Sequence, residues 1–213
     1  MKLSFDNPFF EFLTTATHFI GLNILFLITC VPIFTIGPAL AALYSVTIKE
    51  SLNENGYMTK RYLKAFKSNF KQGVGATFFF LLTAAIFLFN LSFWYSFNTV
   101  FAQIIFVVIL AATVILFICF IYAFPLMARY ENPLKQTLKN ALFVGMENLK
   151  FTLLIMLILV TVAAFTFWYS MFSIFMLFLG FSFLAYCLSF LFNKIFEKYN
   201  EQKKVQEENA QHA

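Results

Sequence analysis

The chain has 213 residues, of which 61% are hydrophobic and only 12% are charged, compared with about 25% charged residues in an ordinary soluble domain. A soluble domain of ~200 residues still exposes roughly a quarter to a third of the surface of its unfolded chain. A composition this apolar therefore excludes a soluble globule, and it predicts an all-α integral membrane protein.

Three long stretches without Asp, Glu, Lys or Arg define the predicted membrane spans: residues 12–48, 72–128 and 151–193. As single helices the last two would be roughly 85 and 65 Å long, whereas the hydrocarbon core of a bilayer is about 30 Å thick. Each of these two stretches is therefore predicted to form two spans joined by a turn. The first stretch contains Pro32 and Pro38, so it is interpreted as one span followed by a broken extension.

This reading gives about five transmembrane helices in a single membrane domain. The predicted spans are residues 13–37, 73–95, 99–125, 150–169 and 172–193, within a domain of residues 1–196, and a polar tail follows at 197–213.

The same four-residue motif, Phe-Trp-Tyr-Ser, occurs at residues 93–96 and 167–170, and the two copies contain the only tryptophans of the chain. Trp and Tyr side chains favour the membrane interface, where an apolar ring and a polar N–H or O–H each find a suitable medium. The two motifs are therefore predicted to be interfacial turns between spans.

Basic residues predict the orientation in the cell membrane. Residues 49–71 contain six Lys or Arg, residues 129–150 contain four and the tail after Asn193 contains four, whereas neither aromatic turn contains any. Positive loops stay in the cytoplasm, so both loops and the C-terminus are predicted inside and both aromatic turns outside. Five spans would place the N-terminus outside, and a re-entrant pair of segments around the prolines would return it to the cytoplasm.

Each basic loop also predicts an amphipathic cytoplasmic helix. In the first loop the apolar residues Tyr62, Leu63, Phe66 and Phe70 share one face, and the lysines Lys60, Lys64, Lys67 and Lys71 cluster opposite them. In the second loop one face carries Leu134, Leu138, Leu142, Gly145 and Leu149, and the other largely carries Lys135, Lys139, Glu147 and Lys150. The lysines suit either anionic lipid headgroups or a cytoplasmic partner that docks on them.

Short matches between the two halves of the chain suggest a parallel internal repeat. Asn69-Phe70-Lys71, before the second span, is echoed by Asn148-Leu149-Lys150 before the fourth. Pro38-Ala39-Leu40-Ala41 is likewise echoed by Pro125-Leu126-Met127-Ala128.

The sequence contains no recognisable enzyme signature. The three charge-free stretches that form the spans contain no carboxylate and no lysine, the chain has only two histidines, and the three cysteines are isolated in separate spans. We therefore expect a protein that is not an enzyme, with no catalytic, cofactor-binding or metal-binding residues. No nucleic-acid partner is expected, because basic and aromatic residues are not interleaved as a nucleic-acid platform requires.

Four segments, Phe5–Phe10, Pro32–Ala39, Ala41–Tyr44 and Lys64–Gln72, resemble the YesL-type membrane proteins of Gram-positive bacteria, which form a domain family of unknown function. Members are often encoded beside carbohydrate-uptake transporters and glycan-degrading enzymes. The resemblance therefore implies an accessory role in sugar import, with subunits of a sugar ABC transporter as partners. In the first segment, Asp6-Asn7-Pro8 is expected to form the N-cap and first turn of a helix.

The proline-broken stretch, with Pro32, Thr35, Gly37 and Pro38, is the best candidate for a functional site. A helix break at membrane depth is tolerated only where protein or a water-filled cavity satisfies the freed backbone groups. The simpler alternative is a kink at the inner interface.

Two functional hypotheses follow. The first is a non-enzymatic accessory protein that contacts a sugar transporter through Lys60, Lys64, Lys67 and Lys71. The second is a small permease or channel whose path passes Asn23, Thr35, Asn90 and Gln103. The sequence does not determine the oligomeric state.

Overall fold

The computed structural model describes residues 8–54 and 56–211, with side chains from 14 to 54 and from 56 to 200. Across these residues it contains helices and no strand, which confirms the all-α class. The helices are α1 (Pro8–Cys30), α2 (Ile36–Ser51), α3 (Met58–Ser68), α4 (Phe70–Tyr95), α5 (Val100–Arg129), α6 (Leu134–Glu147), α7 (Leu149–Trp168), α8 (Ser170–Phe175) and α9 (Phe181–Gln211). A 3₁₀ turn, η1 (Ile33–Thr35), precedes α2, and a π-helical turn, η2 (Met176–Gly180), precedes α9.

Four helical segments among the described residues are long and apolar enough to cross a membrane: Phe70–Tyr95, Val100–Arg129, Leu149–Trp168 and Ser170–Asn200. They correspond to the last four predicted spans. Large apolar side chains point away from the protein on these helices, such as Phe89 at 70% exposed and Leu157 at 64%. Lipid is the solvent that suits such surfaces, because every helical backbone group is already hydrogen-bonded within the helix.

The first predicted span, residues 13–37, does not form one helix. α1 starts at Pro8, as expected for a proline in a first helical turn, and Asp6 and Asn7 of the expected N-cap lie outside the described residues. α1 ends at Cys30, because the Pro32 ring excludes a continuous helix and restricts the residue before it.

The chain then re-enters a helix at Ile36, and Pro38 occupies the first turn of α2, where a missing N–H costs nothing. α2 has 16 residues, about 24 Å, which is less than the thickness of a bilayer core. It packs against α1, and the choice between five spans and a re-entrant first segment stays a prediction.

α2 is the central helix of the fold. It contacts α1, α3, α4, α5 and α9, and most of its surface is buried through small and aliphatic residues. The buried members are Gly37, Pro38, Ala39, Ala41, Ala42, Leu43, Val46, Thr47 and Ile48. Its opposite faces belong to two different hydrophobic clusters, one shared with α5 and α9 and the other with α1 and α3. α2 therefore joins the two halves of the core.

The start of α2 and the start of α4 approach each other closely in the core. The Gly37 N–H donates to Thr77 Oγ1 at 2.9 Å, and Thr77 Oγ1 in turn donates to the Gly73 carbonyl oxygen at 3.0 Å. A Cβ on Gly73 would lie 2.5 Å from the Pro38 nitrogen, and one on Gly37 would collide with the Gly73 carbonyl oxygen. Only two glycines allow the backbones to come so close.

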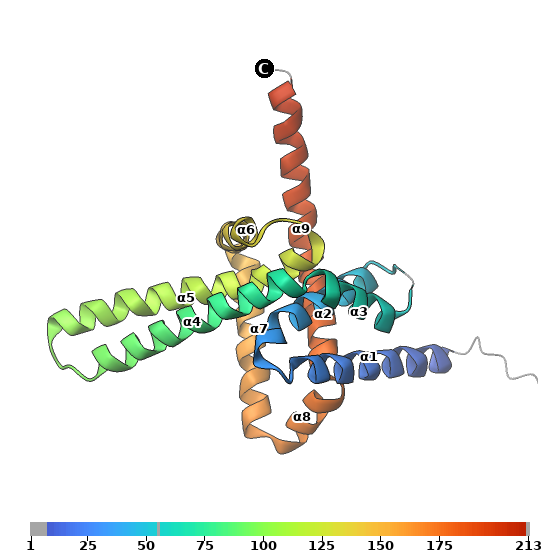
Figure 1. Ribbon diagram of the computed structural model, residues 1–213, viewed down its shortest axis with the longest axis horizontal. Helices are drawn as coiled ribbons and strands as arrows, with labels where there is room; N and C mark the ends of the chain where they lie inside the picture. Colours follow the sequence, from blue (N-terminus) through green and yellow to red (C-terminus); the bar gives the residue numbers. More distant parts are fainter. Residues whose placement is uncertain (1–7, 55, 212–213) are drawn as a thin grey trace, which may run out of the picture.

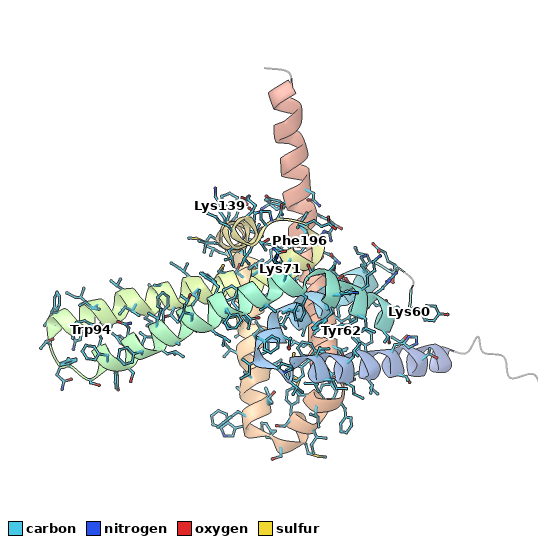
Figure 2. The ribbon with its side chains drawn as sticks, in the orientation of Figure 1. Lys60, Tyr62, Lys71, Trp94, Lys139 and Phe196 are labelled. Atoms are coloured by element: carbon cyan, nitrogen blue, oxygen red, sulfur yellow. The ribbon has the colours of Figure 1, made fainter. Side chains whose placement is uncertain are left out.

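The aromatic turns lie where the sequence predicts. The first motif closes α4 at Tyr95, and the second closes α7 at Trp168. Figure 1 shows α4 and α5 side by side as a hairpin that lies across α7 and α9, so the two turns point in different directions. Trp94 packs against Phe97 and Phe101 at the free end of this hairpin (Figure 2). A common outer side for the two turns stays a prediction.

Local geometry repeats at the two echoed asparagines. Asn69 joins α3 to α4 and donates from Nδ2 to the Ala65 carbonyl oxygen at 3.0 Å, and Asn148 joins α6 to α7 and donates to that of Val144, also at 3.0 Å. The prolines differ, because Pro38 begins α2 whereas Pro125 lies inside α5. The likeness is therefore confined to the joint between an amphipathic helix and a span.

The predicted apolar face of α6 is corrected in part: Gly145 is buried and Leu134 and Leu138 are partly buried against the core, but Leu149 is exposed. The buried residues of α6 are Thr137, Ala141, Val144 and Gly145. A Cβ on Gly145 would overlap the Ile118 side chain of α5, so close packing on α5 favours the small residues over the leucines.

Replacing Gly73 with alanine should destabilise the fold, because the new methyl group must displace the Pro38 backbone. We expect the free energy of unfolding to fall by about 1–3 kcal/mol, the range typical of overpacked cores. The fall should appear as a lower midpoint of thermal unfolding in detergent. Gly21→Ala on α1 is the matched control, since its Cβ would meet nothing within 4 Å. Equal midpoints for the two variants would contradict the proposed role of the α2–α4 contact.

Candidate functional site

The protein itself satisfies the polar groups of the proline break. The Thr35 hydroxyl donates to the Thr29 carbonyl oxygen at the end of α1, at 2.6 Å, and Thr77 accepts from the Gly37 N–H. Pro32 is exposed, whereas Thr35, Gly37 and Pro38 are buried. The four predicted residues therefore form a structural joint, in which the Gly37 N–H and the Thr29 carbonyl oxygen bond to other protein groups, as a break at membrane depth requires.

α3 is fixed to this joint by Tyr62. The Tyr62 side chain is fully buried, and its hydroxyl lies 2.5 Å from Thr29 Oγ1 on α1. Burial raises the pKa of Tyr62 above its usual range, so the hydroxyl stays protonated and can donate this bond. Met58 and Ala65 complete the buried stripe.

The predicted apolar face of α3 is thereby corrected in part. Tyr62 is buried and Phe66 is partly buried, but Leu63 and Phe70 are 49% and 40% exposed. The contact with α1 and α2 rather than hydrophobicity alone decides which stripe is buried. α3 packs against α1 and α2 through this stripe.

The four lysines of the predicted docking face are all exposed, and Lys60, Lys64 and Lys67 follow one another at helical spacing on α3. Lys64 lines a cleft together with Arg61, Ala65 and Ser68, which occupy one stripe of α3. Lys60, Lys67 and Lys71 do not line the cleft. Figure 2 labels Lys60 on α3 and Lys71 near the start of α4. We refer to Lys60, Lys67 and Lys71 as the outer lysines.

The cleft has a volume of about 880 Å³ and lies between the C-terminal part of α2, α3, the start of α4 and the end of α5. Its charged residues are Lys49, Arg61, Lys64, Arg129, Glu54 and Glu131, and its polar residues are Ser45, Ser68, Asn69, Gln72, Tyr130 and Asn132. We refer to it as the basic cleft.

Sequence reasoning missed the basic cleft because its cations come from separate segments. Lys49 and Arg129 are the first charged residues after two of the charge-free stretches. This shared position is the sequence feature that could have indicated that both lie at the same end of the membrane domain. Their approach to Arg61 and Lys64 depends on the packing of α2 against α3 and α5.

Neighbouring side chains hold the Arg129 wall of the cleft. Arg129 Nη1 donates to Asn193 Oδ1 at 2.8 Å, and its guanidinium lies 5.6 Å from the centre of the Phe196 ring. Burial raises the pKa of Tyr130 and the charge of Arg129 opposes that rise; the Tyr130 hydroxyl donates to Asn200 Oδ1 at 2.8 Å. These contacts connect the end of α5 to α9.

The polar residues of the hypothetical permeation path are not brought together. Asn23 is buried and donates to the Leu177 carbonyl oxygen at 2.7 Å, while its Oδ1 accepts from the Ser182 N–H at 3.0 Å. It thereby satisfies groups that the π-helical turn η2 frees. Asn90 donates within its own helix, and Gln103 is exposed on α5. Thr35 is bonded at the proline break.

Among the described residues, no group of three or more His, Cys, Asp or Glu side chains could hold a metal ion.

Replacing Tyr62 with phenylalanine should loosen α3, because only the hydroxyl that bonds to Thr29 is lost. A buried hydrogen bond contributes about 1 kcal/mol, so we expect a slightly lower unfolding midpoint and faster amide hydrogen exchange across α3. Tyr57→Phe is the control, since Tyr57 is 78% exposed. Unchanged exchange in α3 of the Tyr62 variant would show that this bond does not fix the helix.

Comparison with known families matches residues 19–91 to the model described as "Protein of unknown function, DUF624". The matched stretch runs from within α1, through the break, α2 and α3, into α4. The chain has no significant match among curated proteins or among solved structures. The match confirms the resemblance to the YesL-type proteins over residues 19–91, a stretch that is similar to the DUF624 family of unknown function.

Proposed function

We propose that the protein is a non-enzymatic accessory component of the cell membrane that docks a cytoplasmic partner on the outer lysines. The observation that carries this proposal is the mounting of α3. One stripe of the helix is buried on α1 and α2 through Tyr62, while Lys60 and Lys67 remain exposed. A fixed helix that presents a row of cations is suited to a partner with an acidic surface, since its backbone loses little conformational freedom when that partner binds.

The role in carbohydrate uptake comes from the family resemblance. It implies that the docked partner is a subunit of a sugar ABC transporter on the cytoplasmic side, the side to which the positive loops and the C-terminus are assigned. The alternative, a small permease or channel, has less support, because Asn23 and Asn90 already bond to backbone groups on separate elements.

Affinity purification from gently solubilised membranes tests this proposal. Wild-type protein should recover a sugar-transporter subunit, and the double variant Lys60→Glu/Lys67→Glu should lose it, because like charges would then face the acidic partner. Lys135→Glu/Lys139→Glu is the matched control, with the same charge change on exposed residues of α6. Recovery of the protein alone, or equal loss in both variants, would exclude docking on the outer lysines.

Cysteine labelling tests the proposed orientation. In a chain without native cysteines, single cysteines at Ser96 and Ser170 should react with a membrane-impermeant maleimide on intact cells, because both aromatic turns are assigned outside. A cysteine at Ser68 on α3 should react only after permeabilisation. Labelling of Ser68 on intact cells would reverse the assignment.

A further inference from the structure

We propose that the basic cleft binds the phosphoryl group of an anionic ligand, either a soluble phosphate ester or the headgroup of a phospholipid. The proposal does not depend on partner docking, because the outer lysines do not line the cleft.

Cations reach the cleft from three walls. Lys49 stands in the last turn of α2, Arg61 and Lys64 stand on α3, and Arg129 ends α5. Residues so far apart in sequence meet here only because α2 packs against both α3 and α5. The site is therefore a product of the fold, unlike the outer lysines, which the sequence alone places on or beside one helix.

The positive charge in the cleft exceeds the negative charge. Four cationic side chains line it, against the two carboxylates of Glu54 and Glu131, which are both exposed. Within the described part of the chain no ion pair involves Lys49, Lys64 or Arg129. The hydrogen bond of Arg129 goes to the neutral amide of Asn193. Positive side chains that lie together in a recess repel one another. A bound anion offsets this repulsion, so the recess attracts anions.

The cationic groups fit a phosphoryl group in particular, because arginine and lysine together provide a planar fork and point charges for its oxygens. Ser68 and Asn69 make the lining polar, but Ser68 Oγ and Asn69 Nδ2 both donate to the Ala65 carbonyl oxygen at 3.0 Å. Gln72 has a different role, because its Nε2 donates to the Asn132 carbonyl oxygen at 2.8 Å and closes the wall between α4 and the end of α5.

The size and position of the cleft leave the two sources of phosphate open to experiment. About 880 Å³ exceeds the volume of phosphate alone and is in the range of sites for small organic ligands. The cleft lies where two charge-free stretches meet their first cations, which is the headgroup level on the assigned cytoplasmic side. Basic pockets at this level bind anionic headgroups in other membrane proteins.

The test uses the purified full chain in nanodiscs of phosphatidylcholine. Inorganic phosphate and a hexose phosphate are titrated by calorimetry, and retained phosphatidylglycerol is measured by native mass spectrometry after purification from native membranes. The test variant is Lys49→Gln/Lys64→Gln, which removes two exposed charges from the cleft. Lys60→Gln/Lys67→Gln is the matched control, with the same loss of charge outside the cleft.

We expect the wild type to bind at least one probe. The dissociation constant of that probe should rise about tenfold or more in the cleft variant, because each charge-assisted hydrogen bond that is lost supplies a large fraction of the binding free energy. The control variant should bind as the wild type does. Binding of the hexose phosphate identifies a soluble ligand, and retained phosphatidylglycerol identifies a lipid headgroup.

Two outcomes would overturn the proposal. One is the absence of binding for every probe by folded wild-type protein. The other is equal weakening in both double variants, which would show that diffuse surface charge and not the cleft attracts the anion. Neither outcome bears on docking at the outer lysines, whose test is the recovery of a partner.

Discussion

The close contact between the first turn of α2 and the start of α4 is the constraint on which the rest of the structure depends. Gly37 and Gly73 bring two backbones into contact, and Thr77 accepts the one N–H that the helix start leaves free there. The proline break makes this contact possible, because it allows α2 to start a new direction after α1. Held in this way, α2 becomes the shared wall for α1, α3, α5 and α9.

Polar side chains in the apolar helices act mainly as joints between helices. Ser189 Oγ donates to Thr47 Oγ1 at 2.8 Å and links α9 to α2, and the Tyr122 hydroxyl lies 2.9 Å from Thr152 Oγ1 and links α5 to α7. Lipid offers helices little hydrophobic reason to associate, so close packing and such hydrogen bonds determine which helices meet. The same reasoning explains Asn23, which a sequence alone could equally place in a permeation path.

One helix carries two surfaces with different chemistry. The buried stripe of α3 positions Lys64 toward the basic cleft and leaves Lys60 and Lys67 outside it. A ligand in the cleft would touch α2, α3 and the end of α5 at once. Because α3 is attached to the proline break through Tyr62 and Thr29, the cleft, the break and the outer lysines belong to one mechanically connected part of the chain.

The sequence by itself determined the properties that follow from solvent and chain connectivity. The uncharged stretches are long and apolar enough to need a lipid environment, and Pro32 prevents a continuous helix. The aromatic motifs lie at the turns after Tyr95 and Trp168, and the basic loops contain α3 and α6. Only the tertiary structure decided that α2 is a buried central helix, that Leu63 faces outward, and that Lys49 and Arg129 meet across a cleft. Periodicity reports which residues share a face of one helix. Which face is buried, and which distant cations approach each other, depends on contacts between helices that no single segment encodes.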